Sequence, residues 1–109
     1  MALAVRMVNL YKYLTEEKKE YVLSKQVLRS GTSVGAIVYE SEHSESTSDF
    51  IHKLAIAQKE INETLYWLEL LSRTDYITPK EYDSIKTDAT EVIKLLTSIL
   101  KTTKIIIIC

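Results

Sequence analysis

Two pairs of an acidic residue and a histidine have the spacing by which helices hold metal ions. Glu40 precedes His43 and Asp49 precedes His52, each by three residues. In ferritin-like bundles such pairs hold two metals together with a carboxylate from each of the other two helices, all at mid-bundle. Here both pairs flank the polar segment 41–48 at one end of the expected helices. We therefore expect a solvated loop with ordinary helix caps, and neither a metal nor a cofactor.

Hydroxyl-bearing residues and glycines gather in a second motif, RSGTSVG, at residues 29–35. A phosphate-binding loop needs a preceding strand, a lysine and a free helix N-terminus, and none of these accompanies the motif. No histidine lies at a suitable distance in sequence to activate a hydroxyl group, so we predict that the protein is not an enzyme. We expect the motif to serve close helix packing through Arg29, Ser30, Gly31, Thr32, Ser33 and Gly35.

The two glycines of the chain both lie in this motif, inside a stretch that otherwise has a helical pattern. Glycine in a helix interior costs about 1 kcal/mol relative to alanine. Gly31 and Gly35 are four residues apart and share one helix face. Such a face lets another backbone approach closely, which is a steric use for both residues.

Basic and aromatic residues suggest a third kind of function, nucleic-acid binding. The candidate phosphate contacts are Lys18, Lys19, Lys25 and Arg29, and the candidate stacking surfaces are Tyr11, Tyr13 and Tyr21. A nucleic-acid-binding domain is typically strongly basic, whereas this chain has a formal net charge of −1. Solvated helix faces explain the same lysines. We keep nucleic-acid binding as the alternative function and do not favour it.

Four amphipathic segments must position all of these residues. Apolar residues recur at spacings of three and four in the segments 3–14, 17–42, 47–73 and 79–104. Two glycines and one proline are too few for a turn-rich all-β fold. Short connections between long helices favour antiparallel neighbours, so we predict an all-α fold, an up-and-down antiparallel four-helix bundle.

Capping residues mark where three of the helices start. Thr15, followed by two glutamates, is expected to cap the second segment. Ser46 has an acidic residue three positions later, which favours a cap at the third. Thr78 and Glu81 form a capping box around Pro79, at the first position of the fourth helix.

Composition bounds the class of protein. At 109 residues, with 46% hydrophobic and 27% charged residues, the chain fits one globular domain, which we place at residues 1–104. No apolar run approaches the roughly 20 residues that cross a bilayer, so we expect no membrane partner. Cys109 is the single cysteine and fits a reducing cytoplasm.

Residues 105–109 form a separate apolar tail, IIIIC. Exposed isoleucines without a charge promote aggregation, so something should cover them. The first helix is shorter than the second, and we expect it to leave the face from Gly31 to Ile37 bare. We predict that Ile105–Ile108 extend the last helix or fold back, and cover this groove or the matching surface of a neighbouring copy.

The segment 47–73 carries two apolar strips, one more than a monomeric bundle needs. A second strip indicates that the helix also meets another subunit. The candidate subunit or partner contacts are Phe50, His52, Lys53, Tyr66, Trp67 and Leu70.

Three long stretches resemble a known family. LSKQVLRSGTSVGA, DFIHKLAIAQKEINETLYWLELL and TSILKTTK are similar to four-helix-bundle proteins encoded in intervening sequences of 23S ribosomal RNA genes. The resemblance covers about residues 3–104 and implies a bacterial cytoplasmic protein without catalytic activity, assembled in rings that are commonly homopentamers. Ile37 stands where this family usually has asparagine.

From the residues and the resemblance together we predict a homo-oligomeric interaction scaffold or adaptor with a protein partner. A structurally similar relative, the accessory protein of diversity-generating retroelements, binds a reverse transcriptase and nucleic acid. That fold-level analogy implies the alternative, a nucleic-acid-binding accessory factor with a reverse-transcriptase-like partner.

Overall fold

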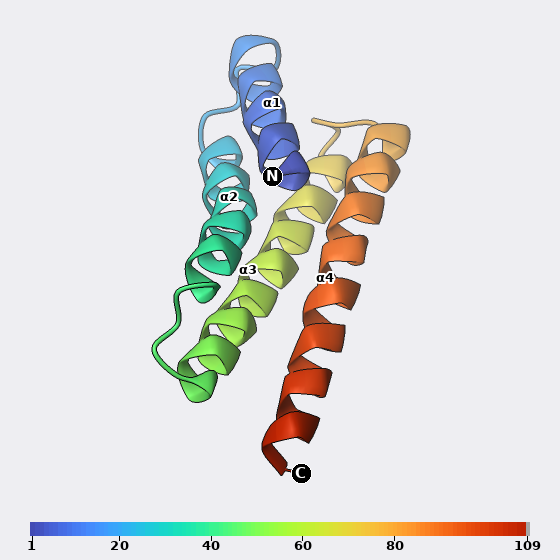
Figure 1. The fold of residues 1–109 in the computed structure, drawn as a ribbon. Helices are drawn as coiled ribbons and strands as arrows, with labels where there is room; N and C mark the ends of the chain where they lie inside the picture. Colours follow the sequence, from blue (N-terminus) through green and yellow to red (C-terminus); the bar gives the residue numbers. More distant parts are fainter. Residues whose placement is uncertain (109) are drawn as a thin grey trace.

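Four helices make up the fold in the computed structural model, which describes residues 1–108, with side chains for residues 1–104. They are α1 (Ala2–Glu16), α2 (Leu23–Ser41), α3 (Thr47–Arg73) and α4 (Pro79–Ile108), and the described residues contain no strand. Consecutive helices run in opposite directions and pack side by side (Figure 1). The predicted up-and-down four-helix bundle is confirmed.

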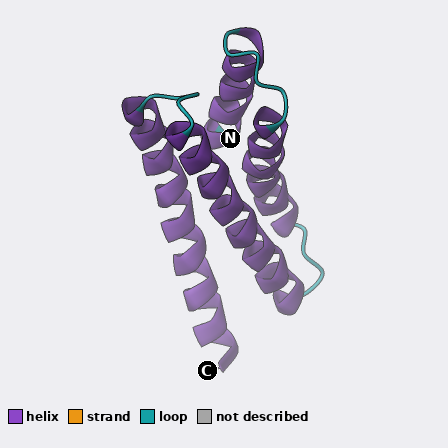
Figure 2. Cartoon of the chain, turned by 180° about the vertical axis from the view of Figure 1, so that it is seen from behind, coloured by secondary structure: helices purple, strands orange, loops and turns teal. Residues whose placement is uncertain are grey.

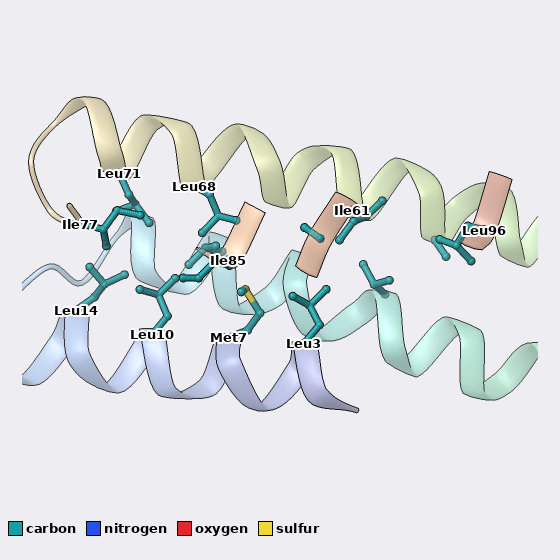
Figure 3. Packing of buried hydrophobic residues seen from close by; sticks show 14 of the residues in the cluster. Leu3, Met7, Leu10, Leu14, Ile61, Leu68, Leu71, Ile77, Ile85 and Leu96 are labelled. Atoms are coloured by element: carbon teal, nitrogen blue, oxygen red, sulfur yellow. The ribbon is translucent and has the colours of Figure 1, made fainter. Parts of the chain in front are cut away.

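The core lies along the line where the apolar stripes of the helices meet. In Figure 3 the α1 side chains Met7, Leu10 and Leu14 point across the core toward Leu68 and Leu71 of α3. All five are buried, and Met7, Leu14, Leu68 and Leu71 have no exposed area. Because these side chains recur every three or four residues, each helix buries one face and leaves the other to solvent.

Two of the three predicted helix caps are confirmed. The Ser46 hydroxyl accepts the backbone N–H of Asp49 at 3.1 Å and caps α3. At the start of α4 the Thr78 hydroxyl accepts the N–H of Glu81 at 3.1 Å, while the Glu81 carboxylate accepts the N–H of Thr78 at 2.8 Å. Each cap satisfies backbone donors that have no partner within their own helix.

The predicted start of the second helix is wrong. Thr15 lies inside α1, where its hydroxyl donates to the carbonyl of Tyr11 at 2.9 Å, and α2 begins six residues later than expected, at Leu23. Between the two helices Lys19 has a positive φ of 56°, so the chain reverses there. The cap of α2 is instead the buried Glu20, whose carboxylate accepts three backbone N–H groups within 2.8 Å.

The helices differ in length, and this opens one side of the bundle. α1 has 15 residues and α4 has 30, so α1 lies beside only the first part of α4. Beyond the start of α1, α2 and α4 flank α3 with no helix in front of it (Figure 1). Seen from behind, the end of α4 projects past the connection between α2 and α3 (Figure 2).

The structure tests the prediction for the tail only through the backbone of residues 105–108. The backbone of Ile105–Ile108 extends α4, which is one of the predicted alternatives, and the helix runs past the expected end near residue 104. Cys109 and the side chains of the four isoleucines lie outside the described residues, so their predicted cover stays a prediction. No helix within residues 1–108 is both long enough and apolar enough for a membrane crossing.

Candidate interaction surface

A cluster of polar side chains joins α2 to α3 on the outside of the bundle. The Arg29 guanidinium lies 2.6 Å from Glu63 and 3.5 Å from Glu60. The Ser33 hydroxyl donates to Glu60 at 3.2 Å, and the Trp67 indole N–H donates to Glu63 at 3.2 Å. We call these five residues the Arg29–Trp67 cluster. It fixes the side chains of one α2–α3 surface through charge-assisted hydrogen bonds.

Glu63 is the electrostatic centre of this cluster. The Trp67 indole N–H has the largest effect and lowers the pKa of Glu63; burial opposes it, and the hydrogen bond and positive charge of Arg29 lower the pKa further, so that it lies below its ordinary value of 4.5. Arg29 faces two carboxylates, so its positive charge is balanced within the chain.

We expect the contribution of Glu63 to stability to disappear in acid. Because the folded pKa is lowered, the stabilisation is present at pH above 4.5 and is lost as the pH falls through the folded pKa. The pairs are partly solvated, so the contribution should be at most about 1 kcal/mol. Urea unfolding of wild type and Glu63→Gln, followed by Trp67 fluorescence, should give a difference in stability at pH 7 that shrinks as the pH is lowered below 4.5. A difference that stays constant over this range would contradict the pairing.

Next to the cluster, α3 carries a strip that faces away from the bundle. His52, Ile56, Tyr66 and Leu70 share this face by their helical spacing, and we call them the outer strip. Tyr66 is 59% exposed and Ile56 is 36% exposed. The Tyr66 ring meets the Trp67 ring edge to face, with centroids 5.0 Å apart. An aromatic ring held in this way is a large, rigid contact surface.

The six predicted subunit contacts are not one patch. Tyr66, Trp67 and Leu70 gather near one end of α3, and the exposed His52 lies on the same face farther along. Phe50 packs against the core instead, and Lys53 pairs with Asp49 at 3.0 Å within α3. The spacing of apolar residues predicts the helix itself, but it does not show which of these six residues lie on its outer face.

The residues of the predicted helix-packing motif do not share one environment. Ser30 is fully buried, and its hydroxyl accepts a hydrogen bond from Thr64 of α3 at 3.0 Å. Gly31 is buried against α1, where an added Cβ would lie 2.6 Å from Met7 Sδ. Gly35 is exposed, and nothing lies within 4 Å of a Cβ built there. A close contact at Gly35 would therefore have to come from another molecule.

Arg29 and Ser33 of the motif belong to the Arg29–Trp67 cluster, and Thr32 forms hydrogen bonds within α2. The Thr32 hydroxyl donates to the carbonyl of Leu28 at 2.7 Å, and the whole motif lies inside α2. Its backbone N–H groups are therefore committed to helical hydrogen bonds, which leaves none for a phosphate. Ile37, at the position of the family's usual asparagine, packs partly buried against the core.

The predicted nucleic-acid contacts lie in two places. Lys18 and Lys19 belong to the connection between α1 and α2, and Lys25 belongs to the first turn of α2. Lys18 Nζ lies 5.9 Å from the centre of the Tyr13 ring. Arg29 is farther along α2, within the Arg29–Trp67 cluster. Among the described residues no three His, Cys, Asp or Glu side chains converge on a point where a metal ion would bind.

The family model described as "23S rRNA-intervening sequence protein" matches residues 1–98. The chain belongs to this family. The chain is also similar to a solved structure, a protein of unknown function from the S23 ribosomal protein family of Bacteroides thetaiotaomicron, to which it is 62% identical. The similarity covers 92% of this chain and 93% of that one, with a TM-score of 0.91. No curated protein matches the chain.

Membership of the intervening-sequence family confirms the resemblance stated from the sequence. It assigns no reaction, since the solved structure is described as that of a protein of unknown function. The Arg29–Trp67 cluster and the outer strip are therefore interpreted from their own geometry.

Proposed function

We propose that this family member is a non-enzymatic, homo-oligomeric interaction scaffold that acts in the cytoplasm. The observation that carries the proposal is the outer strip of α3, where Tyr66 and Ile56 stay exposed although the core is already filled. Contact surfaces between proteins are enriched in such aromatic and aliphatic side chains, and a few of them supply most of the binding energy.

The Arg29–Trp67 cluster supports this role by preorganising the surface. Glu63 orients the Trp67 indole through a hydrogen bond, and the Trp67 ring in turn packs edge to face against Tyr66. A side chain that is already ordered loses little conformational entropy when a partner binds. The resemblance implies that copies of the chain assemble in a ring, commonly of five, and we propose that the ring presents its remaining surfaces to another protein.

The solution mass tests this proposal. We expect wild type to sediment as a multimer built from rings of about five copies, and Tyr66→Lys to weaken the assembly by at least tenfold, because a buried charge replaces an apolar anchor. Tyr21→Lys is the matched control, since Tyr21 is 53% exposed but lies in the connection between α1 and α2. Wild type that sediments as a single copy would overturn the proposal.

The same experiment separates the alternative function, in which the chain is a nucleic-acid-binding accessory factor. That alternative requires RNA or DNA to sediment with the protein and to dissociate steeply as salt rises, because lysine–phosphate contacts release counterions. Lys18→Glu with Lys19→Glu would abolish such binding and leave the self-association of the scaffold unchanged.

A further inference from the structure

The open side of the bundle contains a groove that no part of the described chain fills. It lies between α2 and α4 beyond the start of α1 and has a volume of about 800 Å³. Gly35 and Ala36 form part of one wall, and Leu95 and Ile99 form part of the other. Leu95 is 60% exposed although its neighbour Leu96 is buried in the core. An apolar surface of this kind, rimmed by polar residues, marks a contact site.

The rim of the groove is acidic at the end away from α1. Among the described side chains that line the groove, the charged ones are Glu40 and Glu42, at the end of α2. The last turn of α2 has no basic residue. The C-terminus of a helix also carries a partial negative charge, which adds to the two carboxylates. The groove therefore favours an apolar occupant with positive charge at its edge.

The end of α4 has this complementary chemistry. Residues 92–108 contain three lysines and no acidic residue. Lys101 and Lys104 are exposed, and the sequence continues with four isoleucines. This end of the helix projects past the connection between α2 and α3 (Figures 1 and 2). It is therefore free to reach a second molecule.

The direction in which the helices run is also compatible with a second copy of α4 in the groove. A helix that continued the line of α1 through the groove would run antiparallel to α4, as α1 does. Two copies of α4 related by a two-fold axis perpendicular to them run antiparallel as well. The projecting end of a second copy thus enters the groove in the direction that an up-and-down bundle requires.

We infer that the projecting end of α4 in one copy docks in the groove of a second copy, and that the contact is reciprocal. The inference rests on the proposed self-association and assigns it a second contact, separate from the outer strip. The glycine and alanine of the α2 wall let the incoming helix approach closely, which gives Gly35 a steric use. The lysines of the incoming helix lie against Glu40 and Glu42.

A substitution in the groove wall tests the contact. Leu95→Lys places a charge in the groove and repels the incoming lysines, while the exposed position leaves the fold intact. Because a two-fold contact joins two rings of about five copies each, we expect wild type to sediment as about ten copies and this variant to sediment as a single ring, at half that mass. Ser98→Lys is the matched control, because Ser98 is also exposed on α4 but does not line the groove, and should keep the wild-type mass. An unchanged mass for Leu95→Lys overturns the inference.

Charge exchange provides the second test. Glu40→Lys with Glu42→Lys should also halve the mass, and adding Lys101→Glu with Lys104→Glu should restore it. Failure of this restoration overturns the pairing of the two ends.

Tyr66→Lys distinguishes the two proposals. If it dissociates the assembly while the groove variants do not, the scaffold proposal stands and the groove contact falls. If the groove variants alone dissociate the assembly, the groove contact stands and the outer strip is not the interface.

Discussion

Replacing Gly31 with leucine should destabilise the protein by about 3 kcal/mol or more, the upper end of the cost of overpacking a filled core. The backbone of α2 at Gly31 lies directly under Met7 of α1, and even a single Cβ would lie 2.6 Å from the Met7 sulfur. Met7 has no exposed area, so it has no free space to move into. The larger side chain therefore has to push α1 away from α2. Urea unfolding monitored by helical circular dichroism measures the loss.

Gly35→Leu is the matched control for this prediction. Gly35 lies one turn farther along the same helix, and no atom lies within 4 Å of a Cβ built there. Leucine is a better helix former than glycine by up to about 1 kcal/mol, so in the Leu95→Lys background, in which the groove contact is absent, this variant should be as stable as its parent or slightly more stable. Met7→Ala should restore part of the stability of Gly31→Leu, because it vacates the space that the leucine needs. Equal stabilities of the two glycine variants would contradict the different roles of the glycines.

The two glycines show which feature of the packing the sequence alone does not predict, namely which of them is covered by α1. Their spacing correctly places both on one face of α2. The predicted bare face from Gly31 to Ile37 is wrong at Gly31, which lies under Met7, and at Ile37, which packs against the core. It is confirmed at Gly35 and Ala36. Which glycine is covered depends on the point at which α1 begins relative to α2, and that register is a tertiary property. Because α2 starts at Leu23 and not near residue 17, α1 reaches Gly31 and stops short of Gly35.

The regular parts of the bundle were predictable for local reasons. The bounds of α3, Thr47–Arg73, agree with the predicted segment, because its apolar pattern is uninterrupted and Ser46 caps it. The Arg29–Trp67 cluster was not predictable in this way. Its ion pairs join residues 31 and 34 positions apart, and the charges of Glu60 and Glu63 look like ordinary solvated residues until α2 is placed beside α3.

The missed start of α2 has a similar cause. The residues after Thr15 are glutamates and lysines, which are good helix formers, and no glycine or proline interrupts them. The reversal occurs at Lys19, a residue type that rarely adopts a positive φ. What compensates is the cap by Glu20, which lies outside the residue types usually expected at a helix start.

Removing the Glu20 carboxylate should accordingly cost about 2–3 kcal/mol, the range for hydrogen bonds to a charged group at a helix start. One carboxylate oxygen accepts the N–H groups of Val22 and Leu23, both at 2.7 Å, and the other accepts that of Ser24 at 2.8 Å. In Glu20→Ala these three donors lose their partner at a position where Ser24 is fully buried. The partial positive charge of the α2 N-terminus also loses its counterion.

Glu20→Gln distinguishes the cap from simple packing, because it keeps the size of the side chain. Its amide has one acceptor oxygen and turns a donor toward the N–H of Ser24, so we expect a loss between those of wild type and alanine. Glu17→Ala, at an exposed site in the same connection, should change stability by less than about 0.5 kcal/mol. Amide hydrogen exchange at Leu23 and Ser24 should accelerate in both Glu20 variants. If the glutamine variant is as stable as wild type, the side chain acts by packing, and the reversal at Lys19 must be held by other contacts.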